Sequence, residues 1–409
     1  MNQATGPLSH IRVLDLSRIL AAPWAGQLLA DLGAQVIKVE RPGAGDDTRS
    51  WGPPFLKDAE GRETKEAAYY LAVNRGKRSI TVSLEKPEGQ RLVRELAARS
   101  DIVLENFKAG TLERYGLDQR SLRKLNPRLI YCSVTGFGQT GPRRDQPAYD
   151  FLIQAMGGLM SVTGEKAGKS GAGPQKVGVP IVDLMSGMYA AVAVLAALAR
   201  RNETGQGEYI DIGMLDVQVA TLSNQAMNFL VSGKTPVRSG NAHPNIQPQD
   251  VYACRDGDVI LVVGNDGQFA KLCEVLGRTE WIQDERFATN PQRVRNIDVL
   301  SGRLRELFSQ WQRAALIAAL DRAGVPCGPI NTVPEVFEDP QVKHRGVLTH
   351  VPHPCGVGVP QLASPMRFAD APLQAVDAPP MLGQHSDEIL EELGYDLAGI
   401  AALRSGGVI

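Results

Sequence analysis

One aspartate stands out as a residue that could do chemistry. Asp183 is the only charged residue between Ile181 and Ala199, where the sequence is otherwise small or apolar and contains no proline. The pattern predicts a helix that starts near Pro180 and is buried nearly all round. In the first turn of that helix, the dipole and the free backbone N–H groups would keep the carboxylate ionised and fixed. A carboxylate held in this way could act as a nucleophile.

Two other interpretations of the same stretch are open. Asp183 could cap a core helix or form a salt bridge within it, because a buried carboxylate without a partner is costly. The stretch also approaches the ~20 residues that a membrane span needs. Ser186, Gly187 and the many alanines favour instead a helix that packs closely inside a protein core.

Three cations suggest a phosphorylated ligand. Arg41, Lys108 and Arg114 each come shortly after a predicted strand. Because open α/β sheets bind ligands outside the carboxyl ends of their strands, these cations are expected to converge on one rim. The basic turn at residues 75–78 could also hold phosphates, or it could be a solvated charged turn.

Strands alternate with helices over the first 135 residues. The predicted strands cover residues 11–16, 34–40, 101–106 and 128–134, and the predicted helices cover residues 24–32, 87–99 and 112–126. This order is typical of a mostly parallel, doubly wound α/β sheet. The first turn, SRILAAP, has no glycine, so the dinucleotide pattern GxGxxG is missing, and Glu40 alone is weak evidence for a ribose site.

The rest of the chain has a different character. The segment from residue 41 to about 65 lacks periodicity and is expected at the surface. A loop at residues 232–250 is rich in Gly, Pro and Asn, and a loop of that length is usually functional or a linker. A hairpin around Asp256 and Gly257, followed by helices, predicts a smaller α+β domain. Residues 324–382 are rich in proline and are expected to form an irregular return linker.

The composition is that of an ordinary soluble globular protein. The 409 residues are 43% hydrophobic and 22% charged, with a net charge of −1. This balance gives no electrostatic case for nucleic acid or for an anionic membrane as a partner. No secretory signal is seen at the N-terminus, so a cytoplasmic protein is expected. The five cysteines form no CxxC pair, which favours reduced thiols over a disulfide framework or a metal site.

Several stretches together resemble the class III CoA-transferase family. They include VLDLSRILAAP, GAQVIKVERPGAGDDTR, NRGKRSITVSL, SDIVLENFKAGTLERYGL, YDFLIQAMGGLMSVTG, VDLMSG, TGQGEYIDIGMLD and LGQHSDEILEELGY, in order along the whole chain. The resemblance implies an interlocked, ring-like homodimer. Each subunit would have a Rossmann-like large domain in two parts, residues 1–225 and, after a return linker, residues 331–409. Residues 226–330 would form the small domain with its linkers.

The resemblance also assigns roles to residues. Asp183 matches the family nucleophile, which forms an acyl-aspartyl anhydride and then an aspartyl-CoA thioester. No metal, ATP or permanently bound cofactor is implied, since CoA enters as the acyl-CoA substrate. The residues expected to contact CoA are Leu20, Ala21, Arg41, Val82, Ser83, Leu84, Glu85, Asn106, Phe107, Lys108, Arg114 and Tyr149. A loop at residues 239–245, with Gly240, Asn241 and His243, would cover the aspartate and keep water out.

Two positions depart from the formyl-CoA transferases of this family. Leu20 replaces a glutamine near the acyl group, and Asp150 replaces a glutamate. Formate and oxalate are therefore not the expected substrates. The loop looks more like that of members that use succinyl-CoA and a dicarboxylate such as glutarate, whose distal carboxylate could pair with His243 or Arg238.

Two other functions are alternatives to CoA transfer. An α-methylacyl-CoA racemase shares the fold but needs an acid/base pair, and it has Gly-His-Asp where this chain has Ala148, Tyr149 and Asp150. Tyrosine is a poor base near neutral pH. A non-catalytic CoA-binding protein is a third possibility, which the aspartate and its covering loop disfavour.

Overall fold

A computed structural model describes residues 6–371, 373 and 377–409 of the chain. The chain divides into two compact units, each of which is described by itself. The first unit comprises the residues up to Leu159, Val177–Ala226 and Gln341–Ile409. The second comprises Met160–Lys176 and Met227–Pro340. The first unit is therefore discontinuous in sequence, and its last part returns after the second unit.

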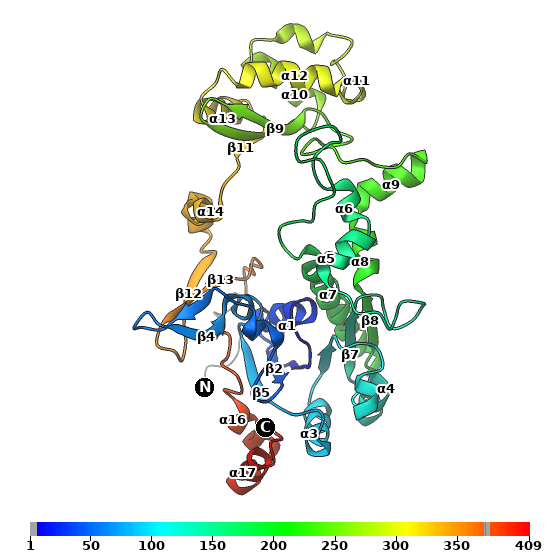
Figure 1. The fold of residues 1–409 in the computed structure, drawn as a ribbon, viewed down its shortest axis with the longest axis vertical. Coiled ribbons are helices and arrows are strands. Elements are labelled where there is room, and N and C mark those ends of the chain that lie inside the picture. Colours follow the sequence, from blue (N-terminus) through cyan, green and yellow to red (C-terminus); the bar gives the residue numbers. More distant parts are fainter. Residues whose placement is uncertain (1–5, 372, 374–376) are drawn as a thin grey trace. The chain divides into compact units, whose positions relative to one another are not determined.

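The first unit is built on a six-stranded parallel sheet (Figure 1). Its strands are β1 (Arg12–Asp15), β2 (Gln35–Glu40), β5 (Lys77–Thr81), β6 (Ile102–Glu105), β7 (Ile130–Thr135) and β8 (Tyr209–Gly213). Their order is β5-β2-β1-β6-β7-β8, and every neighbouring pair is parallel. The chain winds first to one side of β1 and then to the other. The switch between β1 and β6 is where such a sheet opens a ligand crevice at its carboxyl edge.

Helices cover both faces of this sheet because successive side chains of a strand point to opposite faces. Val13 packs in the cluster formed with α1 (Ala21–Asp31) and α7 (Ile181–Thr204). Its neighbour Leu14 packs in the cluster on the other face. That second cluster is formed with α3 (Pro87–Ala98), α4 (Gln119–Leu125), α16 (Ser386–Leu393) and α17 (Leu397–Ser405). The predicted α/β class with a large parallel sheet is confirmed.

Helix α7 packs against α1 at close range. A Cβ atom on Gly187 would lie 2.4 Å from the carbonyl oxygen of Ala21, so only glycine fits at this crossing. The prediction that α7 is buried all round was wrong, because its outer face leaves Tyr189 44% and Val192 60% exposed in the single chain. Within the described residues, α7 alone has the length and apolar composition of a membrane span, and its packing on α1 explains that composition.

The remaining elements of the first unit are short. They are η1 (Asp47–Ser50), the hairpin β3 (Phe55–Lys57) and β4 (Glu63–Ala67), α2 (Ala68–Leu71), η2 (Leu112–Tyr115), α5 (Asp150–Met156), α8 (Met214–Thr221), and the hairpin β12 (Leu348–Pro352) and β13 (Gly358–Leu362). Three helices, α6 (Leu159–Val162), α9 (Ser223–Ser232) and α15 (Pro340–His344), contain sequence boundaries between the units.

The second unit has its own core around a three-stranded antiparallel sheet of order β11-β10-β9. Its elements are β9 (Gln249–Cys254), β10 (Gly257–Val262), α10 (Asp266–Val275), η3 (Thr279–Ile282), α11 (Asn290–Arg295), α12 (Ile297–Phe308), α13 (Arg313–Arg322), β11 (Cys327–Pro329) and α14 (Val333–Glu338). The predicted hairpin is β9–β10, with Gly257 opposite Cys254.

Two segments expected to be irregular contain regular secondary structure. The segment after residue 41 forms η1 and the β3–β4 hairpin, and it buries Asp46, Arg49 and Glu66 rather than lying at the surface. The segment 324–382 holds α14, α15 and the β12–β13 hairpin. Prolines misled the prediction here, because Pro334 occupies the first turn of α14, where a proline fits a helix.

Candidate active site

Asp183 lies in a cavity of about 200 Å³ at the carboxyl edge of the sheet. The walls of the cavity come from the start of α1, the segments after β6 and β7, and the first turn of α7. Of the residues expected to contact CoA, the cavity is lined by Leu20, Ala21, Asn106, Phe107, Lys108 and Tyr149. These residues are far apart in sequence, so the fold brings a predicted nucleophile and half of the predicted CoA contacts to one place.

The first turn of α7 is capped by Asp150, from helix α5. The backbone N–H groups of Val182 and Asp183 donate to Oδ2 of Asp150 at 2.7 and 3.2 Å. Gln154 Nε2 donates to its other oxygen at 2.6 Å. The free N–H groups that were expected to keep Asp183 ionised are therefore used by a different carboxylate. Burial, and then the nearby charge of Asp150, raise the pKa of Asp183 to about 7, so that expectation was wrong.

The raised pKa of Asp183 predicts a pH dependence. We expect kcat/KM to rise about tenfold per pH unit below pH ~7 and to level off above it, because only the ionised carboxylate can attack. The measurement is kcat/KM between about pH 5 and about pH 9. Asp150→Asn keeps an acceptor for the α7 amides but removes the neighbouring charge, so it should shift the midpoint to lower pH. A profile that is flat down to about pH 5 would contradict the prediction.

One aromatic residue near Asp183 was not predicted from the sequence. Tyr69, on α2, is close enough to Asp183 and Asp150 that burial and then these two charges raise its pKa to about 12. Its ring meets that of Trp51 edge to face, with centroids 5.1 Å apart. The phenol therefore stays protonated at physiological pH and is a potential hydrogen-bond donor near the nucleophile.

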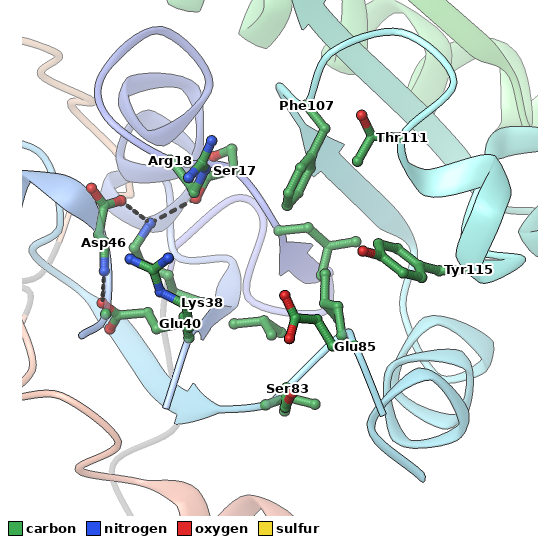
Figure 2. Close-up of a pocket in the computed structure, with 16 residues that line it drawn as sticks. Ser17, Arg18, Lys38, Glu40, Asp46, Ser83, Glu85, Phe107, Thr111 and Tyr115 are labelled. Atoms are coloured by element: carbon green, nitrogen blue, oxygen red, sulfur yellow. Dashed lines mark hydrogen bonds and ion pairs between the residues drawn. The ribbon is translucent and has the colours of Figure 1, made fainter. Parts of the chain in front are cut away.

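A second cavity, of about 230 Å³, lies beside the ends of β1, β2 and β5 (Figure 2). Phe107, Thr111 and Tyr115 face it from one side, and Ser17, Lys38 and Asp46 from the other. Of the predicted CoA contacts, it is lined by Arg41, Val82, Ser83, Leu84, Glu85 and Phe107. Phe107 lines both cavities, so the cavity with the exposed cation lies next to the cavity of the aspartate.

The three predicted cations only partly converge. Arg41 lines the second cavity with an exposed side chain, and Lys108 lines the cavity of Asp183. The guanidinium of Arg114 lies 5.7 Å from the ring centre of Tyr115, which lines the second cavity.

The basic turn at residues 75–78 does not hold phosphate, because two of its cations are buried in ion pairs. Lys77 Nζ lies 2.8 Å from Oδ2 of Asp15, and both side chains are fully buried. Arg75 pairs with Asp31 at 2.5 Å and is also buried. Burial lowers the pKa of Lys77 to about 8, and Asp15 opposes that shift. Both interpretations of this turn, as a phosphate site or as a solvated turn, were wrong for these two residues.

Glu40 is likewise unavailable as a ribose-binding acid. Its oxygens accept from Arg49 Nε and Nη2 at 2.8 Å each. The hydroxyl of Ser79 and the backbone N–H of Asp46 also donate to it, at 2.6 and 3.0 Å. Glu40 lines the second cavity, but its carboxylate is buried and bonded to groups of the protein itself.

The predicted covering loop belongs to the second unit. Within that unit, Gly240 adopts a positive φ of 66° and donates its N–H to the carbonyl of Gly164. The Nδ1 atom of His243 accepts from the backbone N–H groups of Asn245 and Ile246, at 3.1 Å each. His243 therefore shapes the loop itself. Asn241 lies in the same turn and is exposed.

Comparison with known proteins identifies the class to which this site belongs. Residues 8–386 match the family described as CoA-transferase family III, and the chain belongs to that family. It is an enzyme of the CoA-transferase type.

Individual relatives agree with this assignment. The chain is 50% identical over 391 residues to the succinate–glutarate CoA-transferase of Agrobacterium fabrum, covering 95% of this chain and 96% of that one. It is 42% identical over 410 residues to the succinyl-CoA:glutarate CoA-transferase of Homo sapiens, covering 98% and 90%. The crystal structure of a CAIB/BAIF family protein from Brucella suis superposes with a TM-score of 0.83 at 51% identity, covering 95% and 100%.

Proposed function

We propose that the enzyme transfers CoA from succinyl-CoA to a free dicarboxylate such as glutarate, with Asp183 as the nucleophile. The observation that carries the proposal is the position of Asp183, at the first turn of α7 in a cavity that shares Phe107 with a second, cation-lined cavity. The relatives named for succinate, succinyl-CoA and glutarate support the choice of substrates.

The proposed reaction proceeds through two covalent intermediates. The Asp183 carboxylate attacks the thioester carbonyl, the C–S bond breaks, and CoA leaves as a thiolate while a mixed anhydride forms. The thiolate then attacks the aspartyl carbonyl and releases succinate, which leaves an aspartyl-CoA thioester. Glutarate attacks this thioester and the same two steps run in reverse. The thioester energy is conserved throughout, so no resident cofactor or metal is needed.

The start of helix α1 is suited to stabilise the oxyanions of these steps. Leu20 and Ala21 occupy the N-cap and first helical positions of α1 and line the cavity of Asp183. Amides at these positions lack a partner within the helix and could donate to an oxyanion that forms in the cavity. The nucleotide part of CoA would lie in the second cavity with Arg41 near its phosphates, and Lys108 would follow the chain toward Asp183.

Mass spectrometry of trapped enzyme tests the proposal. Enzyme incubated with succinyl-CoA and then treated with hydroxylamine should carry a hydroxamate on the peptide that contains Asp183, and glutaryl-CoA should form when glutarate is added. Enzyme treated with hydroxylamine without succinyl-CoA is the control. An unmodified Asp183, with deuterium entering the α-carbon of a 2-methylacyl-CoA, would show a racemase instead.

We further propose that two copies of the chain form a homodimer. The outer face of α5 and α7 exposes a run of large apolar side chains, of which Phe151 is 56% and Val192 60% exposed. A monomer rarely leaves such a patch in water, and a second copy of the same patch would cover it. Sedimentation is expected to show two chains for the wild type and one for Val192→Asp. A monomeric wild type at micromolar concentration would overturn this assignment.

A cytoplasmic location is also proposed. All five cysteines are unpaired, and Cys132 and Cys273 are buried, as expected for a protein kept in a reducing compartment. Labelling the native protein with a thiol reagent in cell extract should recover reduced cysteines. Disulfide-linked species would contradict the cytoplasmic location.

A further inference from the structure

The turn that joins strand β1 to helix α1 has an unusual backbone. Ile19 has a φ of 71°, in the left-handed region that a β-branched residue rarely adopts. Such a residue persists only where surrounding contacts hold it, and strain of this kind gathers at functional sites. The next two residues, Leu20 and Ala21, begin α1 and line the cavity of Asp183. The conformation of Ile19 therefore sets where their amides lie.

Asp46 supplies the contact that holds Ile19. The backbone N–H of Ile19 donates to both carboxylate oxygens of Asp46, at 3.2 Å each. Lys38 Nζ lies 2.8 Å from the same carboxylate, and both side chains are fully buried. Thr48 donates its backbone N–H and its hydroxyl at 3.0 and 2.8 Å. The carboxylate is thus committed to groups of the protein itself.

The rest of the turn is held in the same way. Lys38 Nζ also donates to the carbonyl of Ser17 at 2.9 Å, and Figure 2 shows Lys38 between Ser17 and Asp46. Asn106 accepts from the backbone N–H of Arg18 at 2.8 Å and donates to its carbonyl at 2.6 Å. Three successive residues of the turn are therefore fixed by side chains from β2 and from the segments after β2 and β6.

We propose that Asp46, braced by Lys38, is a positioning residue for CoA transfer, which keeps Ile19 left-handed and so aims the amides of Leu20 and Ala21 at the reacting carbonyl. The inference rests on the proposed function, since it needs an oxyanion to form beside Asp183. Donor nitrogens must lie about 2.7–3.1 Å from the place where the oxyanion forms, which leaves a tolerance of a few tenths of an ångström. A rigid turn supplies that precision, whereas a relaxed turn would move the start of α1.

The test compares two buried aspartates: Asp46, which holds the turn before α1, and Asp31, the last residue of α1. Asp46→Asn removes the charge and weakens the acceptor for the Ile19 amide. We expect its kcat with succinyl-CoA and glutarate to fall about 100-fold. Because Asp46 also lines the second cavity, the CoA dissociation constant is measured separately, and it should rise by less than about tenfold. Asp31→Asn is the matched control, because it breaks a buried ion pair with Arg75 at the last residue of α1. It should lower the melting temperature while kcat is retained.

A second substitution distinguishes a role in positioning the amides from a general loss of structure. Glycine adopts a positive φ without strain, so Ile19→Gly should recover about tenfold in kcat when added to Asp46→Asn. If Asp46→Asn does not fold, Asn106→Ala tests the same turn without unpairing a buried charge, and its kcat should fall about tenfold.

The outcomes are distinct. If Asp46→Asn, or Asn106→Ala in its place, keeps the kcat of the Asp31→Asn control, the positioning role is overturned and the proposed function stands. If the wild type transfers no CoA and forms no adduct on Asp183, the proposed function fails and this role fails with it.

Discussion

Replacing Asp183 by alanine is expected to abolish CoA transfer, with a loss of at least about 10⁴-fold in kcat. The expected loss is large because no other carboxylate can form the anhydride from this position. Asp150 is the nearest alternative, but its oxygens are used by Gln154 and by two amides of α7. CoA binding should persist, since the second cavity does not include Asp183. Turnover with succinyl-CoA and glutarate, together with CoA binding by calorimetry, measures both effects.

Replacing Asp183 by asparagine is expected to increase the free energy of unfolding. The pKa of Asp183 is raised from 3.8 to about 7 in the folded protein. A carboxyl with a raised pKa makes the native state progressively less stable as pH rises from about 4 to about 7, because the folded state disfavours the charge. Asp183→Asn should therefore raise the free energy of unfolding by about 1–3 kcal/mol above pH ~7 and by little at pH ~4.

The predictions for Asp183 have a control and a result that would contradict them. Asp321, on α13 in the second unit, has an exposed side chain and does not line the cavity of Asp183, so Asp321→Asn should leave turnover unchanged and change stability by less than about 0.5 kcal/mol. An Asp183→Ala enzyme that still exchanged CoA between succinate and glutarate at a measurable fraction of the wild-type rate would exclude the covalent mechanism. If Asp183→Ala were inactive because it did not fold, Asp183→Asn would be measured in its place.

The parallel sheet and the candidate nucleophile could be predicted because both depend on local sequence patterns. Buried strands separated by helical segments leave few other arrangements, and a lone aspartate in an apolar helix is visible without a structure. Partners that lie far apart in sequence are not visible in this way. Lys77 and Asp15 are separated by 62 residues, and Asp150 and Val182 by 32. The predictions for the basic turn and for the ionisation of Asp183 were wrong for that reason.

The exposed face of α7 shows another limit of sequence patterns. Val192 is as apolar as Val194, yet Val192 is 60% exposed and Val194 is buried. Composition cannot distinguish an apolar face that packs in its own chain from one that a second copy covers. The left-handed turn at Ile19 could not be predicted either, since isoleucine normally avoids that conformation and only tertiary contacts with Asp46 hold it there.

Replacing Lys77 by methionine is expected to lower the free energy of unfolding by about 3–5 kcal/mol and to leave CoA affinity unchanged. Lys77 Nζ bonds to Asp15 at 2.8 Å, to the carbonyl of Pro23 at 2.9 Å and to Asn74 at 3.0 Å, all within the core. Its loss leaves Asp15 buried without its main counter-charge. Denaturant unfolding measures the stability, and calorimetry measures the CoA dissociation constant.

The double variant Asp15→Leu, Lys77→Met separates the ion pair from the packing around it. Removing both charges avoids the cost of one unpaired buried ion, so the double variant should recover most of the loss. Lys65→Met, on an exposed lysine of β4, is the control and should change stability by less than about 0.5 kcal/mol. If Lys77→Met were stable but bound CoA far more weakly, the lysine would contact phosphate after all, and the buried pair with Asp15 would have to open when the ligand binds.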